Sequence, residues 1–251
     1  MTSMFQSLWL GVVLVLAGCA SGPSHHTAAP RQSAEHPLDR DAYDVLNLRG
    51  WTVLVAPGYR DHPELRSEVL DLLDDHLYRI NRAVPSPALD RLHEFEIWAE
   101  LDMHKTKCMC YHVSSDWLLA NGYNPDKAGT VEIGNARAFL EWTHGQPWMV
   151  LHELAHAYHD QILGFDNPDV IAAYQAMLDS GEYEEVLHIS GSPRRHYALT
   201  NDHEYFAEAT EAWFGTNDFH PFVRPELVEI DPVGAALMQR VWSPEHAEDE
   251  S

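Results

Sequence analysis

The stretch Pro147–Leu163, which reads PWMVLHELAHAYHDQIL, decides how this sequence folds. A proline stands in its first turn, and Gly164 follows its last residue, as is typical of a helix. Its apolar side chains recur at helical spacing, at Leu151, Leu154, Ala155, Tyr158 and Ile162. The stretch therefore predicts one amphipathic helix over residues 147–163.

The same helix carries His152-Glu153-Leu154-Ala155-His156, an HExxH motif. Residues i and i+4 share one helical face, so both imidazoles can bind a single zinc ion. Glu153 can then take a proton from a water molecule that the zinc activates. An exposed polar face on a surface helix is the alternative, but the surrounding apolar pattern favours a metal site.

A catalytic zinc site needs a third protein ligand and an open position for water. The position ten residues after His152 is Ile162, which excludes the metzincin pattern. His159 lies one turn beyond His156, too close on the same helix to complete a tetrahedron. We therefore expect His159 to lie behind the ligands or to be exposed.

Glu204 and Glu208 are spaced i, i+4 on a helix predicted over residues 201–214. A first carboxylate can bind zinc, and a second, one turn on, can accept the other N–H of a ligand histidine. Two alternatives remain open at this point. Asn201 and Glu204 also form a capping box, and Glu204, Glu208 and Glu211 could be a solvated acidic stripe.

Taken together, HExxH and the later Tyr-x₆-Glu-x₃-Glu resemble the catalytic domains of anthrax lethal factor and of the Pro-Pro endopeptidases, over residues 145–215. These are zinc metallopeptidases of the gluzincin type. The resemblance implies one zinc ion per chain, bound by His152, His156 and Glu204. It also implies a zincin-like α+β domain over residues 39–242, with a small mixed sheet before the motif helix and a mostly helical C-terminal half.

The resemblance further implies the roles of three residues around the zinc. Glu153 is the general base, Tyr197 stabilises the oxyanion, and Glu208 is the carboxylate behind a ligand histidine. The implied activity is hydrolysis of peptide bonds in a polypeptide substrate. An amidase or another carbonyl hydrolase is an alternative within the enzymes, because a fold does not determine a substrate.

A competing third ligand is Asp218. The stretch Gly215-Thr216-Asn217-Asp218 resembles the start of the GTxD motif of aspzincins, in which the aspartate binds zinc. The Tyr-Gly that follows in that motif is replaced here by Pro221-Phe222. An Asx-type turn at the end of the helix is the simpler interpretation.

The remaining pattern indicates an α+β fold, because strands come early and helices late. Strands are predicted at residues 51–56, 94–101 and 130–133, and further helices at 63–84, 168–180 and 232–241. We expect Gly129–Asn135 to be the edge strand beside the motif helix. Zincin relatives use such an edge to pair with extended substrate.

Charge and composition exclude some classes of partner. The chain has 16 Lys and Arg against 39 Asp and Glu, a net charge of −23, and 45% of its residues are hydrophobic. This composition is that of a globular protein. The charge argues against binding to nucleic acid and against electrostatic docking on anionic lipid. A monomer is expected.

The N-terminal segment is predicted to be a targeting signal. The apolar run Leu8–Gly18 is too short to span a bilayer and suits a signal peptide. Leu16-Ala17-Gly18-Cys19 resembles the bacterial lipoprotein signal, which implies a lipid on Cys19. Met1–Ser7 lacks the usual Lys or Arg, so a plain secretory peptide or a buried helix remains open.

The lipoprotein signal implies four segments. Residues 1–18 form the signal peptide, 19–38 a flexible tether, 39–242 the catalytic domain and 243–251 an acidic tail. The protein would then work outside the cytoplasm, held by its lipid to a bacterial membrane in the periplasm or at the cell surface. A non-catalytic zincin-fold lipoprotein that binds a polypeptide or cell-surface partner is the alternative function. Glu153 and Tyr197 favour the enzyme, because a binding protein needs neither.

The two remaining cysteines are Cys108 and Cys110, whose short loop makes a disulfide strained. A second metal site from His104, Cys108, Cys110 and His112 fits no familiar ligand pattern. We favour buried or redox-active thiols.

Overall fold

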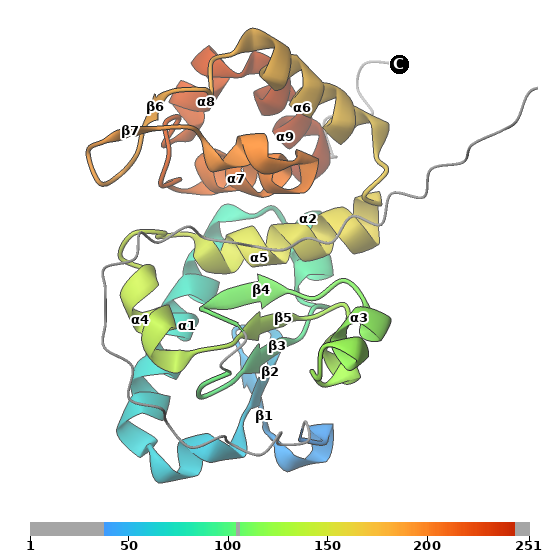
Figure 1. The fold of residues 1–251 in the computed structure, drawn as a ribbon, viewed down its shortest axis with the longest axis vertical. Helices are drawn as coiled ribbons and strands as arrows, with labels where there is room; N and C mark the ends of the chain where they lie inside the picture. Colours follow the sequence, from blue (N-terminus) through green and yellow to red (C-terminus); the bar gives the residue numbers. More distant parts are fainter. Residues whose placement is uncertain (1–37, 104–105, 244–251) are drawn as a thin grey trace, which may run out of the picture. The chain divides into compact units, whose positions relative to one another are not determined.

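The computed structural model describes residues 38–103 and 106–243, with a five-stranded mixed sheet in the N-terminal half and a mostly helical C-terminal half (Figure 1). The predicted α+β class is therefore confirmed. The signal peptide, Cys19, the tether up to residue 37, His104 and the tail from residue 244 lie outside the described residues.

The sheet has the strand order β1-β2-β3-β5-β4. Strands β2, β3 and β5 are parallel, and β1 and β4 are antiparallel to their neighbours at the two edges. A separate two-stranded hairpin lies in the C-terminal half. The strands are β1 (Asp44–Leu48), β2 (Trp51–Val55), β3 (Ile97–Ala99), β4 (Met109–Tyr111), β5 (Val131–Ile133), β6 (Val186–Leu187) and β7 (Pro193–Arg194).

The expectation that Gly129–Asn135 forms the sheet edge is wrong. Its strand, β5, lies between β3 and β4 and is buried at all three residues. The edge belongs to β4, which contacts the motif helix α5 (Met149–Tyr158). Sequence pattern did not predict β4, because three half-buried residues are too few to establish a period of two.

The predicted helices agree with the structure to within a few residues, whereas the short ones were not predicted. Besides α5, the helices are α1 (Pro63–Ala83), α2 (Ser86–Leu92), α3 (Ser115–Ala120), α4 (Ala136–Trp142), α6 (Pro168–Ser180), α7 (Asp202–Phe214), α8 (Arg224–Ile230) and α9 (Pro232–Trp242). Among the described residues, no helix combines the length and apolar character needed to cross a membrane.

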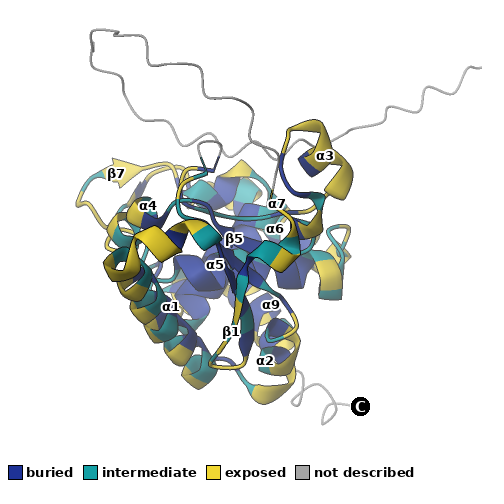
Figure 2. Cartoon of the chain, turned by 90° about the horizontal axis from the view of Figure 1, so that it is seen from below, coloured by how far each residue is buried: buried dark blue, intermediate teal, exposed yellow. Residues whose placement is uncertain are grey.

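The motif helix α5 is buried on almost every side because it lies between the sheet and the C-terminal helices (Figures 1 and 2). It contacts β4, α1 and α2 as well as α7. This explains why most of its residues are apolar, as expected for a helix with several packed faces. A π-helical turn, His159–Leu163, continues it and stops at Gly164, whose φ is 82°.

Trp148, the residue before α5, packs against the backbone at the end of α7. A Cβ atom built on Gly215 would lie 1.9 Å from Trp148 Cε2, so only glycine allows this approach. The contact joins the two helices that carry the predicted site residues.

We predict that Gly215→Ala lowers the free energy of unfolding by about 2 kcal/mol, the usual cost of overpacking. Gly145→Ala is the matched control, because Gly145 is exposed and its Cβ would come no closer than 3.7 Å to another atom. Denaturant titration of the two variants measures the difference. Equal stabilities would contradict the proposed close packing.

Candidate metal centre

Three side-chain donors converge where α5 packs against α7. The Nε2 atom of His152 lies 3.1 Å from His156 Nε2 and 3.2 Å from Glu204 Oε2. His156 Nε2 lies 3.3 Å from the same carboxylate oxygen. The structure thus brings the predicted third ligand to the histidine pair across 52 positions of sequence.

These distances fit a tetrahedral zinc site. Zinc binds nitrogen and oxygen ligands at about 2.0–2.2 Å, which places two ligands of a tetrahedron roughly 3.4 Å apart. All three separations are close to this value. Two imidazoles and one carboxylate also form a donor set of catalytic zinc sites, which keep a fourth position for water or substrate.

Glu204 is positioned by the start of α7. The Asn201 side chain accepts a hydrogen bond from the Glu204 N–H at 2.8 Å and caps the helix. The capping prediction is therefore confirmed for Asn201, while the Glu204 carboxylate faces the histidines. The alternative of a solvated acidic stripe is wrong, because Glu204, Glu208 and Glu211 are at most 2% exposed.

The carboxylate that orients His152 is Glu211. Its Oε1 lies 2.7 Å from His152 Nδ1, whereas Glu208 Oε1 lies 3.7 Å away, beyond hydrogen-bond distance. The structure thus gives Glu211 the place that we expected for Glu208. Glu211 follows Glu204 by seven residues, so it shares that helical face, and this spacing could have indicated it.

The centre concentrates negative charge in a buried place. Within the described part of the chain, the ion-pair partners of Glu204, Glu208 and Glu211 are His152, His156 and His196. Burial opposes ionisation of Glu204, but His156 and His152 outweigh it and hold the pKa of this carboxyl well below its usual range. A bound cation would offset this charge.

Glu153 and Tyr197 flank the three donors. The Glu153 Oε2 atom accepts a hydrogen bond from the Tyr111 N–H of β4 at 2.8 Å, and burial raises the pKa of Glu153. The Tyr197 hydroxyl lies 3.4 Å from Glu204 Oε1. No sequence pattern could indicate the role of Tyr111, because it acts through its backbone.

Two other predicted residues lie elsewhere. Asp218 does not reach the histidine pair, and its carboxylate lies 3.4 Å from His188 Nε2 instead. His159 is neither exposed nor hydrogen-bonded to a ligand. It is fully buried, its ring nitrogens have no hydrogen-bond partner, and burial lowers its pKa to about 3.

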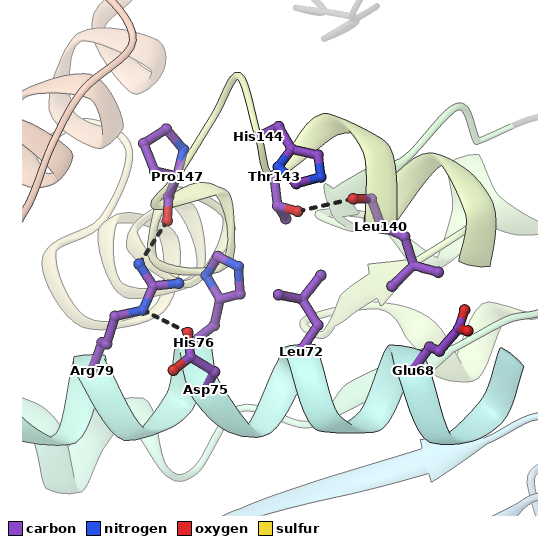
Figure 3. Close-up of a pocket in the computed structure, with 9 residues that line it drawn as sticks. All are labelled: Glu68, Leu72, Asp75, His76, Arg79, Leu140, Thr143, His144 and Pro147. Atoms are coloured by element: carbon purple, nitrogen blue, oxygen red, sulfur yellow. Dashed lines mark hydrogen bonds and ion pairs between the residues drawn. The ribbon is translucent and has the colours of Figure 1, made fainter. Parts of the chain in front are cut away.

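A hollow of about 610 Å³ lies between α1 and α4 and holds none of these donors (Figure 3). Apolar Leu72 and Leu140 line it together with polar side chains of α1 and of the segment just after α4, and His76 points toward it. His76 is only 3% exposed, and burial, followed by the nearby Arg79 charge, lowers its pKa to about 4. This surface has no donor set for a metal, so the candidate site is the centre on α5 and α7.

Comparison with protein-family models, with curated proteins and with solved structures finds no match for this chain.

We predict that Glu211→Gln weakens zinc binding by about 10–100-fold, because a neutral amide is a poorer acceptor for the His152 N–H. Glu208→Gln is the matched control, and its effect should be smaller because Glu208 makes no hydrogen bond to that nitrogen. Competition with a chromophoric chelator measures both affinities. A larger loss in Glu208→Gln would restore Glu208 as the orienting residue.

We also predict that His76 makes the fold sensitive to acid. Its native pKa of about 4 lies below the ordinary value of 6.5, so the unfolded chain binds the proton first. The stability it contributes is complete above pH 6.5 and is lost as the pH falls toward 4, by up to about 3 kcal/mol.

The test measures the free energy of unfolding from pH 7 to pH 4.5. The loss should be smaller in His76→Phe than in the wild type. His144→Gln, an exposed position beside the same hollow, should follow the wild type. Parallel curves for His76→Phe and the wild type would contradict the prediction.

Proposed function

We propose that this chain is a zinc metallopeptidase with a zincin-like domain of the gluzincin type, which acts from a lipid anchor on Cys19 outside the cytoplasm. One observation carries the proposal. Three buried donors from α5 and α7 lie 3.1–3.3 Å apart, with Glu153 beside them. This is the spacing, the donor chemistry and the base that zinc-dependent hydrolysis requires.

Bound zinc would supply the Lewis acid that polarises a carbonyl and activates a water molecule. Glu153 would be the base. In the structure its Oε2 accepts a hydrogen bond from the Tyr111 amide, and Oε1 is the oxygen that would take a proton and return it to the leaving amine. The burial that raises the Glu153 pKa supports this role, because a base works best when its pKa approaches the working pH.

Tyr197 would stabilise the oxygen of the attacked carbonyl. Its hydroxyl lies next to Glu204 in a long hydrogen bond of 3.4 Å, which a substrate oxygen can replace at small cost. One such donor is worth roughly 3 kcal/mol in the transition state.

The outer edge of β4, the last strand of the sheet, offers a place for an extended peptide. Backbone groups of Cys108 and His112 bond to the neighbouring segment Thr130–Gly134, so the alternating residues Met109 and Tyr111 direct theirs to the free side. Tyr111 N–H is on that side and reaches Glu153. A polypeptide that pairs with β4 would therefore lie beside the base, which supports peptide over small-amide substrates.

The alternative function, a non-catalytic binding lipoprotein, could use a bound metal to stabilise its fold. It would have no use for a general base. The two functions therefore differ in what Glu153 does.

We predict that Glu204→Ala lowers zinc occupancy, because it removes a ligand. Glu153→Gln should keep the zinc and lose about 10²–10⁴-fold in turnover, because it removes the base. Metal analysis of the purified chains and cleavage of a peptide library measure the two effects.

Full zinc occupancy in Glu204→Ala would rule out that ligand. Equal turnover in Glu153→Gln and the wild type would rule out the base. A wild type that holds zinc and cleaves no peptide in the library would favour the binding protein.

A further inference from the structure

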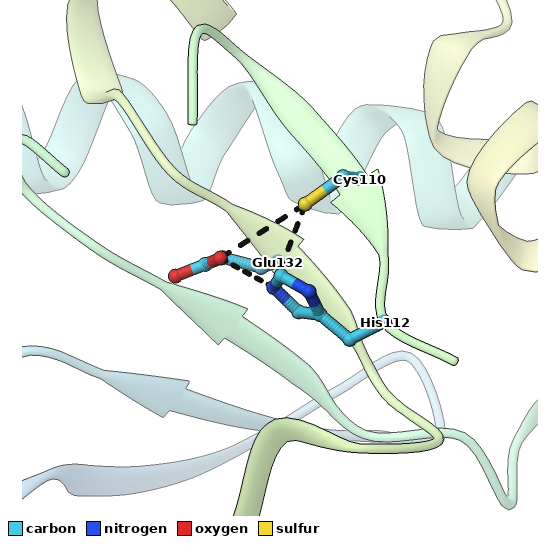
Figure 4. Close-up of side chains that lie close together, drawn as sticks. All are labelled: Cys110, His112 and Glu132. Carbon is cyan, nitrogen blue, oxygen red and sulfur yellow. Dashed lines mark hydrogen bonds and ion pairs between the residues drawn. The ribbon is translucent and has the colours of Figure 1, made fainter. Parts of the chain in front are cut away.

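A second cluster of metal-ligating side chains lies on β4 and β5. Cys110 of β4, His112 just after it and Glu132 of β5 point toward one another (Figure 4). Cys110 and Glu132 are cross-strand partners, and His112 shares the face of Cys110 because it follows by two residues. His112 is 6% exposed and Glu132 is 0% exposed, while Cys110 is half-buried.

Cys108 does not belong to this cluster. Its thiol lies 3.4 Å from Met149 Sδ in the core. Cys108 and Cys110 are both free thiols. Of the four residues considered from the sequence, Cys110 and His112 come together with Glu132, Cys108 does not, and His104 lies outside the described residues.

The donor atoms surround one point. Cys110 Sγ lies 3.5 Å from His112 Nε2 and 3.9 Å from Glu132 Oε2. A zinc ion at about 2.3 Å from sulfur and 2.0–2.2 Å from nitrogen and oxygen would place the sulfur about 3.6 Å from the other two donors. Thr106 Oγ1, at 3.4 Å from Glu132 Oε2, offers a fourth donor atom.

The remaining pair, His112 Nε2 and Glu132 Oε2, is 2.6 Å apart, which is a hydrogen-bond distance. These two atoms share a proton, and a metal ion would take the place of that proton. The change needs them to separate by less than 1 Å, to the roughly 3.4 Å between two ligands of a tetrahedron.

The surrounding charges favour a cation at this point. The buried Lys127 ammonium contacts both Glu132 and Glu100, so one positive charge faces two negative charges. A divalent ion bound to Glu132 and to a Cys110 thiolate would bring the whole group to zero net charge. Lys127 contacts Glu132 Oε1, which leaves Oε2 for the ion.

We propose that Cys110, His112 and Glu132 form a second, structural site for zinc or a similar borderline divalent ion, with Thr106 at the fourth position. Sulfur and imidazole donors select such ions over magnesium or calcium. The ion would join the short edge strand β4 to β5. Cys110 precedes Tyr111, so it would also fix the amide that holds Glu153.

Cobalt(II) replacement tests the site, because among the candidate metal-binding clusters of the described residues it is this one that has a sulfur donor. The centre on α5 and α7 offers nitrogen and oxygen alone. We expect the reduced wild type to bind two cobalt ions per chain and to show a thiolate-to-cobalt charge-transfer band in the near ultraviolet. Cys110→Ser should lose the band and one cobalt ion, and Cys108→Ser should keep both.

The wild-type spectrum decides the matter even if Cys110→Ser fails to fold. A cobalt-loaded wild type without the band would overturn the proposal, and so would a band that disappears in Cys108→Ser and persists in Cys110→Ser. Glu204→Ala separates this inference from the proposed peptidase. It should lose the other cobalt ion and keep the charge-transfer band.

Discussion

A carboxylate enclosed between two imidazoles is the interaction on which the rest of this structure depends. Glu204 reaches His152 and His156 only because α7 lies directly against α5, and that approach needs the bare backbone of Gly215 beneath Trp148. Burying acidic groups without lysine or arginine partners costs stability unless a cation accompanies them. The packing of the C-terminal helices and the chemistry of the centre are therefore parts of one arrangement.

The site residues that could be predicted from the sequence are those that recur at helical spacing. The helical period of 3.6 predicts the histidine pair, Glu153 and the helix of Glu204, and the structure brings the donor atoms of His152, His156 and Glu204 together. The same period placed Glu208 and Glu211 on one face but could not say which would reach His152 Nδ1. That choice depends on how α7 is rotated against α5, and a single helix does not contain this information.

The sheet edge was the part that sequence could not supply. β4 has three residues and no clear alternation, so sequence pattern favours the better-patterned β5 as the edge strand. β4 contributes the Tyr111 amide, which contacts Glu153, and the Cys110 thiol, whose cross-strand partner is Glu132. Neither contact can be predicted from the hydrophobic pattern of the strand.

The Tyr111 amide has a consequence for how a peptidase of this design would respond to its substrate. The Tyr111 amide lies at the outer edge of the sheet, and it already donates a hydrogen bond to the Glu153 carboxylate. An incoming chain that adds to this edge would offer its own carbonyl to the same hydrogen. Binding of the peptide would then release Glu153 from this hydrogen bond. Until the peptide binds, the Glu153 carboxylate occupies the position of the peptide carbonyl at the Tyr111 amide.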